Sequence, residues 1–490
     1  MTEEEYKQLC LTCDSILLSN DARLETVAIP WLHVLREHPI FLSQYEDLFQ
    51  KKSSWKSLIN IFINTLKKSS QIIRLIVNIS KLKKNFWIGK LKKEEKFDVI
   101  FVSHLLNVSQ LNTEEDFYFD KIPHELLQRG YKILIVLINQ TSISGKILNH
   151  SFQNLIIPRV VISEYLPLKE EFRIWLNTKK QEIRFRKKAK IEKVEFTKKV
   201  LVRAKKESTS YATKRNLRIA GAIDKVIRQT KAKAIITTYE GHAWERLIYA
   251  TVRSIKKEIK CIGYQHAALF RLQHSAKRSI GSQYDPEIIL TAGLIGFNQM
   301  RSSNSFSGIN FDILGSKNCL KTSQKNLKPA CLVLPEGIFK EVQTLFYFSY
   351  QCAKANPEIH FIWRLHPIIN QNDLAKLSLD FKNIPSNIEI SIQSLKKDIG
   401  RSKWALYRGS TAIISATANG VIPIYLKLKD ELTIDPLYEM KDSHPSIKHV
   451  DNFSSLMKAS VVNPELRDYC AQFFKPIDAS ILANKLKNIH

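Results

Sequence analysis

The sequence predicts an α/β protein with two doubly wound domains and a helical extension at its N-terminus. Its 490 residues are too many for a single hydrophobic core, because single cores stop growing near about 250–300 residues. From residue 97 onward, short apolar segments alternate with longer helical patterns, and this alternation pauses at a polar segment, 317–329, before it resumes. Strands that alternate with helices are typical of parallel sheets covered by helices. We therefore expect two such sheets facing a central cleft.

The extension, residues 1–90, has apolar residues at three- and four-residue spacing, which predicts helices. Trp31, Leu32 and Leu35 are one example. Between 51 and 84, lysines alternate with Ile, Leu and Phe. This pattern suits a helix at a membrane interface, and it equally suits a solvated helix that packs on the next domain.

The first α/β domain is expected over 91–318. Its predicted strands are 97–103, 132–138, 154–158, 234–239, 260–265 and 287–292. A strongly basic segment, about 168–230, separates the third strand from the fourth, and its apolar residues recur at helical spacing. It predicts one or two long helices inserted into the domain.

The second domain is expected over 329–475, followed by a C-terminal helix at 476–490. Its predicted strands are 330–335, 360–365, 388–392, 404–407 and 421–426. Open α/β sheets bind ligands at the carboxyl ends of their strands. Residues at those ends are therefore the candidates for function.

The composition is that of a globular protein, with 44% hydrophobic and 25% charged residues. Lys and Arg number 75 against 47 Asp and Glu, a formal net charge of +28. Such a field attracts nucleic acid, anionic lipid and sugar nucleotides alike. Much of the positive charge lies between 179 and 233, which indicates a local basic surface.

The cellular compartment follows from three features. The acidic start, Met-Thr-Glu-Glu-Glu, differs from a secretory leader, and Lys and Arg interrupt the most apolar segment, 59–88. The seven cysteines are odd in number and widely scattered, as in proteins of a reducing compartment. We expect a cytoplasmic protein, with the basic segment holding it at the periphery of the inner membrane.

The first candidate for chemistry is Glu240, which ends the strand at 234–239. Gly241 permits the sharp exit that turns the carboxylate toward the cleft. There it could act as a general base, with burial raising its pKa toward the working range. The structural alternative is a glutamate that caps the helix starting near Ala243 or pairs with Arg246.

Two further motifs end strands of the second domain. His366, fixed by Pro367, could contact a ribose or phosphate together with Arg364, although a His-Pro pair also simply ends a strand. Ser410 and Thr411 follow Gly409 where a strand gives way to a helix. Hydroxyls and free N–H groups at a helix N-terminus bind anions, and the same residues could serve as a plain helix cap.

An acidic residue with Gly, then His-Pro, then a hydroxyl pair resembles the motif set of bacterial sialyltransferases and of transferases for Kdo and other ulosonic acids. The resemblance implies that Glu240 is the general base, that His366 contacts CMP, and that Ser410 and Thr411 bind its phosphate. It implies a CMP-sugar donor as co-substrate and a glycan or lipid-linked acceptor. In that family two acidic residues usually precede the glycine, whereas Tyr239 precedes Glu240 here.

Other segments extend the resemblance. Residues 284–293 and 311–316 resemble the GT-B superfamily, which implies Rossmann-type domains with the acceptor on the first and the nucleotide sugar on the second. The stretch 263–266 resembles a Gln-His element of Kdo transferases. His266 could accordingly be an alternative base, an acceptor contact or a structural residue. Asp398 and Glu336 are weaker strand-end candidates.

Competing functions remain open at this point. A UDP- or GDP-sugar or CDP-glycerol donor fits the same fold. No Asp-x-Asp or His/Cys cluster with ligand spacing follows a strand, so we expect a metal-independent reaction. The charge also allows a non-catalytic binding protein. Because no RNP motif or zinc-finger spacing is present, we expect the basic segment to bind an anionic membrane rather than nucleic acid.

Overall fold

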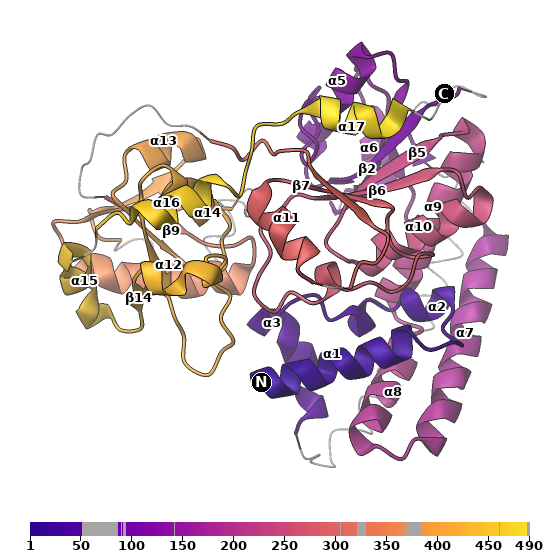
Figure 1. Ribbon diagram of the computed structural model, residues 1–490, viewed down its shortest axis with the longest axis horizontal. Coiled ribbons are helices and arrows are strands. Elements are labelled where there is room, and N and C mark those ends of the chain that lie inside the picture. The colour runs from indigo at the N-terminus through magenta and orange to yellow at the C-terminus, as the bar shows by residue number, and fades with distance from the viewer. Residues whose placement is uncertain are drawn as a thin grey trace.

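The protein is described by a computed structural model in which two parallel sheets lie side by side, each between layers of helices (Figure 1). This arrangement confirms the predicted fold class, a GT-B-like pair of Rossmann-type domains with a helical N-terminal extension. The structure describes residues 1–50, 87–89, 91, 95–141, 143–303, 305–320, 330–366, 369, 384–459 and 461–487.

The first sheet has the strand order β1-β4-β3-β2-β5-β6-β7-β8, and only β1 is antiparallel to its neighbour. The strands are β1 Trp87–Ile88, β2 Val99–Leu105, β3 Ile133–Asn139, β4 Arg159–Ile162, β5 Ala234–Thr238, β6 Lys260–Gln265, β7 Ile288–Thr291 and β8 Asn310–Ile313. Both faces are buried, because Val99 and Phe101 belong to one hydrophobic cluster and Ile100 and Val102 to the other.

The predicted strand at 154–158 is wrong. Pairing starts at Arg159, and Pro158 contributes only its carbonyl, which accepts from Ile135. Proline has no N–H to donate, whereas the following Arg-Val-Val-Ile segment has the β-branched residues that favour a strand.

The second sheet has the order β11-β10-β9-β12-β13-β14 and is parallel throughout. Its strands are β9 Ala330–Leu334, β10 His360–Arg364, β11 Ile388–Ser391, β12 Trp404–Tyr407, β13 Ile422–Leu426 and β14 Ser446–Ile447. The helices of both domains outside the insertion are α5 Ile122–Gln128, α6 Gly145–His150, α10 Ala243–Ile255, α11 Leu294–Arg301, α12 Phe339–Ala355, α13 Leu395–Gly400, α14 Ala412–Ala418, α15 Phe453–Ala459 and α16 Pro464–Ala471. Short 3₁₀ turns are η3 Val108–Leu111, η4 Ser275–Lys277, η7 Tyr438–Ser443 and η8 Val450–Asn452.

The basic insertion forms three helices rather than the one or two expected: α7 Leu168–Ile191, α8 Glu195–Glu207 and α9 Tyr211–Thr230. The break after α8 has a local cause, because Ser210 accepts from the Thr213 N–H and caps α9. The break after α7 is a change to extended backbone at Glu192.

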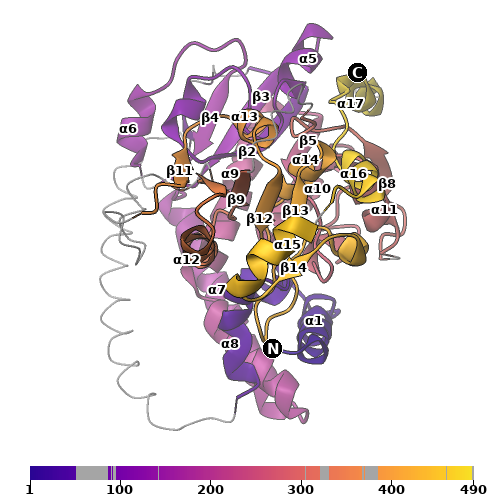
Figure 2. The ribbon, with the colours of Figure 1, turned by 90° about the vertical axis from the view of Figure 1, so that its left-hand side faces the viewer.

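The N-terminal extension folds as α1 Glu3–Leu17, α2 Leu24–Val27, η1 Pro30–His33, α3 Pro39–Leu42 and η2 Ser43–Leu48. It packs against the first domain, where α1 and α8 lie next to each other (Figure 2). The lysine-rich pattern at 51–84 lies outside the described residues. Within the described chain, no helix is both long and apolar enough to cross a bilayer.

The C-terminal segment returns to the first domain. After α16, the chain leaves the second domain and ends in α17 Ala479–Leu486, which packs against α5 (Figure 1). Leu482 and Leu486 are fully buried there. This return tethers the second domain to the first through a second connection.

Candidate functional site

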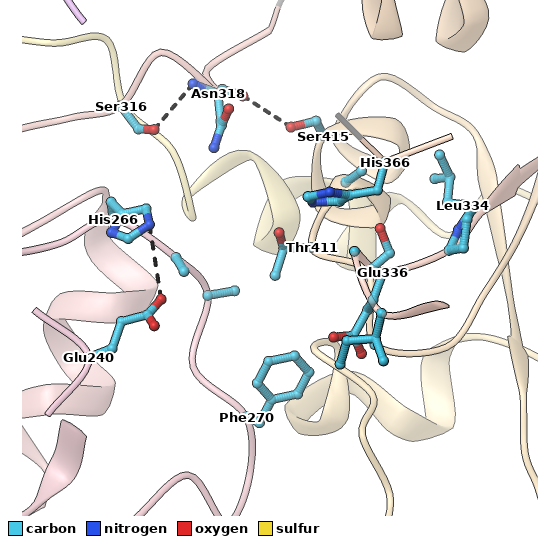
Figure 3. Close-up of a pocket in the computed structure, with 18 of the residues that line it drawn as sticks. Glu240, His266, Phe270, Ser316, Asn318, Leu334, Glu336, His366, Thr411 and Ser415 are labelled. Carbon is cyan, nitrogen blue, oxygen red and sulfur yellow. Dashed lines mark hydrogen bonds and ion pairs between the residues drawn. The ribbon is translucent and has the colours of Figure 1, made fainter. Parts of the chain in front are cut away.

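A cavity of about 550 Å³ lies between the two domains, at the carboxyl ends of their strands. Seven of the predicted site residues line it: Glu240, His266, Arg364, His366, Gly409, Ser410 and Thr411. Glu240 and His266 occupy the wall of the first domain, and His366 and Thr411 lie across from them (Figure 3). Pro367 lies outside the described residues.

Glu240 reaches the cavity because of the turn after β5. Gly241 has a φ of +78°, a conformation that favours glycine, and a Cβ there would lie 2.2 Å from the Ser275 carbonyl oxygen. The Ser275 hydroxyl in turn donates to the Glu240 carbonyl at 2.9 Å. The turn is thus packed tightly against η4.

Glu240 neither caps α10 nor pairs with Arg246, the two structural roles considered from the sequence. The buried Glu245 caps α10, accepting from the backbone N–H groups of Glu240 at 3.1 Å and His242 at 2.9 Å. Arg246 pairs with Asp285. The Glu240 carboxylate is therefore left facing the cavity.

The charge around Glu240 differs from the expectation. Burial acts to raise its pKa, but the hydrogen bond from His242 at 3.1 Å and the positive charges of His242 and Arg36 outweigh burial and lower the pKa to about 2. The expected upward shift is wrong. Burial opposes the charge on His242, yet Glu240 and Glu245 raise its pKa, so Glu240 and His242 form an ion pair.

His266 is the second titratable group on this wall. Its Nε2 lies 4.0 Å from a Glu240 carboxylate oxygen, and 19% of its side chain is exposed. Its ring packs edge-on against Tyr118, with centroids 4.8 Å apart. Burial lowers its pKa, which leaves a neutral imidazole beside an ionised carboxylate. Such a pair can take up a proton on the ring and stabilise the charge that results.

His366 forms part of the opposite wall, directly after β10. Gly337 makes room for its ring, since a Cβ at that position would lie 2.7 Å from Nδ1. Burial lowers the pKa of His366. Arg364 lines the cavity while its Nη1 donates to Asp398 at 2.9 Å. Asp398 is a buried residue of α13, so the structure assigns it to holding Arg364 rather than to a strand end.

Ser410 and Thr411 lead into α14. Thr411 occupies the N-cap position but makes no side-chain hydrogen bond to the helix, so its hydroxyl does not serve as the plain cap. Gly409 also lies very close to Glu336, because a Cβ there would overlap a carboxylate oxygen of that residue. Ser410, Thr411 and Glu336 all line the cavity.

Arg36 and Lys317 line the cavity as well and were missing from the sequence-based site. Arg36 comes from the extension, where its guanidinium lies 4.4 Å from the centre of the Phe270 ring and 5.3 Å from that of Phe41. Its Nη2 donates to Glu336 at 2.7 Å. Lys317, whose pKa burial lowers, lies over the Phe117 ring at 4.2 Å. The position of Lys317 between the two domains could have suggested it, but no sequence pattern brings Arg36 to the cleft.

Similarity to known proteins is found among solved structures. No protein-family model matches the chain, and neither does any curated protein sequence. Among solved structures it is similar to the glycotransferase of kitacinnamycin (11% identity, TM-score 0.46), covering 80% of this chain and 99% of that one. MurG of Acinetobacter baumannii (10%, 0.45) and UDP-GlcNAc 2-epimerase of Neisseria meningitidis bound to UDP-GlcNAc (11%, 0.45) each match over 80% of this chain and 99% of theirs.

Proposed function

We propose that the protein is a glycosyltransferase that moves a sugar from a nucleotide donor to a glycan or lipid-linked acceptor. One observation carries the proposal. Glu240 and His266 on the first domain face hydroxyl, imidazole and cationic groups of the second domain across one cavity. Transfer of a glycosyl group needs these two functions at the two ends of the bond that is exchanged.

In this reaction an acceptor hydroxyl forms a bond to the anomeric carbon while the bond from that carbon to the donor phosphate breaks. The bonding electrons leave with the phosphate, and the acceptor proton must go to a base. The pKa shifts favour the neutral His266 ring as the proton acceptor, with the Glu240 carboxylate stabilising the imidazolium. His242 holds Glu240 in its ionised state.

The leaving phosphate needs groups that stabilise negative charge. Ser410 and Thr411 line the cavity together with His366, and Arg364 and Lys317 add positive charge. The motif resemblance favours a CMP-activated ulosonic acid as donor, and UDP-sugars, GDP-sugars and CDP-glycerol are the alternatives. We expect the reaction to proceed without a metal and the enzyme to work at an anionic membrane, where lipid-linked acceptors reside.

Calorimetry with CMP, UDP and GDP tests the donor. We expect CMP to bind most tightly, and His366→Ala to weaken it by about 1–3 kcal/mol through loss of one hydrogen bond to a charged ligand. His360→Ala is the matched control, because His360 lies at the opposite end of the same strand and pairs with Glu389. Firm UDP or GDP binding would overturn the CMP donor, and equal CMP affinity in both variants would overturn the role of His366.

Turnover that EDTA abolishes would contradict the metal-independent reaction.

A further inference from the structure

The outer face of α7 has an unusual composition. All 24 residues of this helix are described, and twelve of them are exposed. Six are apolar or aromatic and six are basic: Leu168, Phe172, Trp175, Leu176, Ile183 and Ile191, with Lys169, Arg173, Lys180, Arg186, Lys187 and Lys190. The acidic residues of the helix are half-buried or buried. We call these twelve residues the α7 outer face.

The orientation of this face is fixed by the other side of the helix. Glu171, Ile174 and Phe185 are buried there, and the Glu171 carboxylate forms a buried ion pair with Arg218 of α9 at 2.7 Å. Arg184 and Lys188 both pair with Asp21 of the extension. These two cations therefore stabilise the fold, and the remaining basic residues point away from the protein.

The apolar part of the face is large for a surface helix. Phe172 is 63% exposed and Trp175 is 44% exposed, and their rings stack with centroids 5.7 Å apart. The described chain has seventeen exposed large apolar side chains, and six belong to this one helix. Soluble monomers rarely keep such residues together on their surface, so the face is suited to a partner.

Charge complementarity decides which partner fits. In a symmetric pairing of two copies, six cations would meet six cations without any acidic residue between them, which is repulsive. An anionic lipid surface attracts the cations and accepts the aromatic rings between its head groups. The long Lys and Arg side chains can keep their charges at the head groups while their stems cover apolar surface.

We propose that the α7 outer face docks on an anionic membrane, with the helix lying in the plane of the interface. This inference rests on the proposed function only for its purpose, which is to bring the cavity to a lipid-linked acceptor. The helix is on the side of the first domain away from the second (Figure 1), so docking through this face does not cover the second domain.

The test is co-sedimentation with phosphatidylcholine vesicles that contain or lack phosphatidylglycerol. Arg186, Lys187 and Lys190 changed together to Gln should weaken binding to the anionic vesicles about 100-fold, because each contributes roughly a five-fold factor. Phe172→Ser with Trp175→Ser should weaken it about ten-fold or more. Binding of the native protein should fall as salt is added.

Matched controls come from exposed residues of the second domain. Lys396, Lys429 and Lys441 changed to Gln remove the same charge, and Tyr347→Ser with Ile392→Ser removes exposed apolar surface elsewhere. The controls should bind as the native protein does. Equal binding by control and α7 variants, or equal binding to both vesicle types, would overturn the proposal. Loss of a concentration-dependent dimer in the α7 variants, with vesicle binding intact, would assign the face to a second copy instead.

The outcome is separable from that of the proposed function. All α7 variants should keep the native affinity for CMP, because the helix contributes no residue to the cavity. Vesicle binding without nucleotide binding would contradict the glycosyltransferase and leave the docking face standing. Nucleotide binding without vesicle binding would contradict the docking face and leave the proposed glycosyltransferase standing.

Discussion

At the scale of single residues, we propose His266 rather than Glu240 as the base. The sequence marks Glu240 because a carboxylate follows a strand and precedes a glycine. It does not show that His242 pairs with this carboxylate or that His266 lies 4.0 Å away. A carboxylate whose pKa falls to about 2 accepts protons poorly, whereas a neutral imidazole accepts them readily.

We expect Glu240→Gln and His266→Asn each to reduce turnover by about 10²–10⁴-fold with donor affinity nearly unchanged. Glutamine keeps the shape of Glu240 but carries no charge to stabilise an imidazolium, and asparagine cannot accept the proton. Because the two groups act as one unit, the double variant should be little slower than the slower single variant. Losses that multiply in the double variant would show independent roles.

The pH dependence adds a readout that a structural role would not move. Burial lowers the pKa of His266, so kcat/KM should rise with pH through a value below the ordinary 6.5. Glu240 acts to raise that pKa, and Glu240→Gln should therefore shift the acidic limb to still lower pH. An unchanged limb would assign the titration to another group.

The limits of sequence reasoning at this scale follow from distance along the chain. Glu240, His366 and Thr411 could be predicted to lie at the cavity because each follows the end of a strand, which is a local pattern. Arg36 was not found, because its partner Glu336 is 300 positions away. The pKa of Glu240 depends on the position of the His242 side chain and on the distant Arg36, so its direction could not be predicted from the strand-end pattern.

At the scale of elements, the apolar strands could be predicted from the sequence, but the edge strands and the breaks between helices could not. Apolar runs located most of the parallel strands to within a few residues. Short or polar edge strands, such as β1, β8 and β14, carry too weak a pattern. The helical spacing of apolar residues in the insertion continues across both breaks. The sequence signal for the second break is therefore only the helix cap at Ser210.

Gly241→Ala tests the turn that delivers Glu240. Alanine at this position would adopt an unfavourable φ, and its Cβ would overlap the Ser275 backbone. The overlap can be relieved only if the turn after β5 or the backbone at Ser275 shifts. Gly308→Ala is the control, because Gly308 has nearly the same φ, +79°, with open space around it. Chemical denaturation should show Gly241→Ala to be less stable than the control by about 1–3 kcal/mol. Equal stabilities would mean that the overlap is relieved at no cost.

At the scale of the whole molecule, the extension joins the two domains. It packs on the first domain through a network in which Asp14 accepts from His274 at 2.9 Å and from Arg278. It reaches the second domain through Arg36, which donates to Glu336. A segment fixed on one domain and paired with the other is placed to control the width of the cavity between them.

The Arg36–Glu336 pair is mostly withdrawn from water, with 17% and 9% of the side chains exposed. Burial acts to raise the pKa of Glu336, but Arg36 and His38 lower it to about 2. A carboxylate whose pKa is lowered on folding contributes stability above its unfolded value, near 4.5, and that contribution disappears as the pH falls toward 2. The pair should therefore hold the domains together throughout the neutral range.

Arg36→Ala should leave the Glu336 carboxylate buried without its main partner, at a cost on the order of 3 kcal/mol. Adding Glu336→Gln to this variant should recover part of the loss, because no uncompensated charge then remains. Small-angle X-ray scattering at neutral pH should show a larger radius of gyration for Arg36→Ala than for the native protein. Arg271→Ala is the matched control, since its pair with Glu3 is exposed and does not cross the cavity. If Arg36→Ala keeps the native radius, other contacts between the domains, such as the hydrogen bond from Gln299 to Glu439, hold them together, and the extension has no part in closing the cavity.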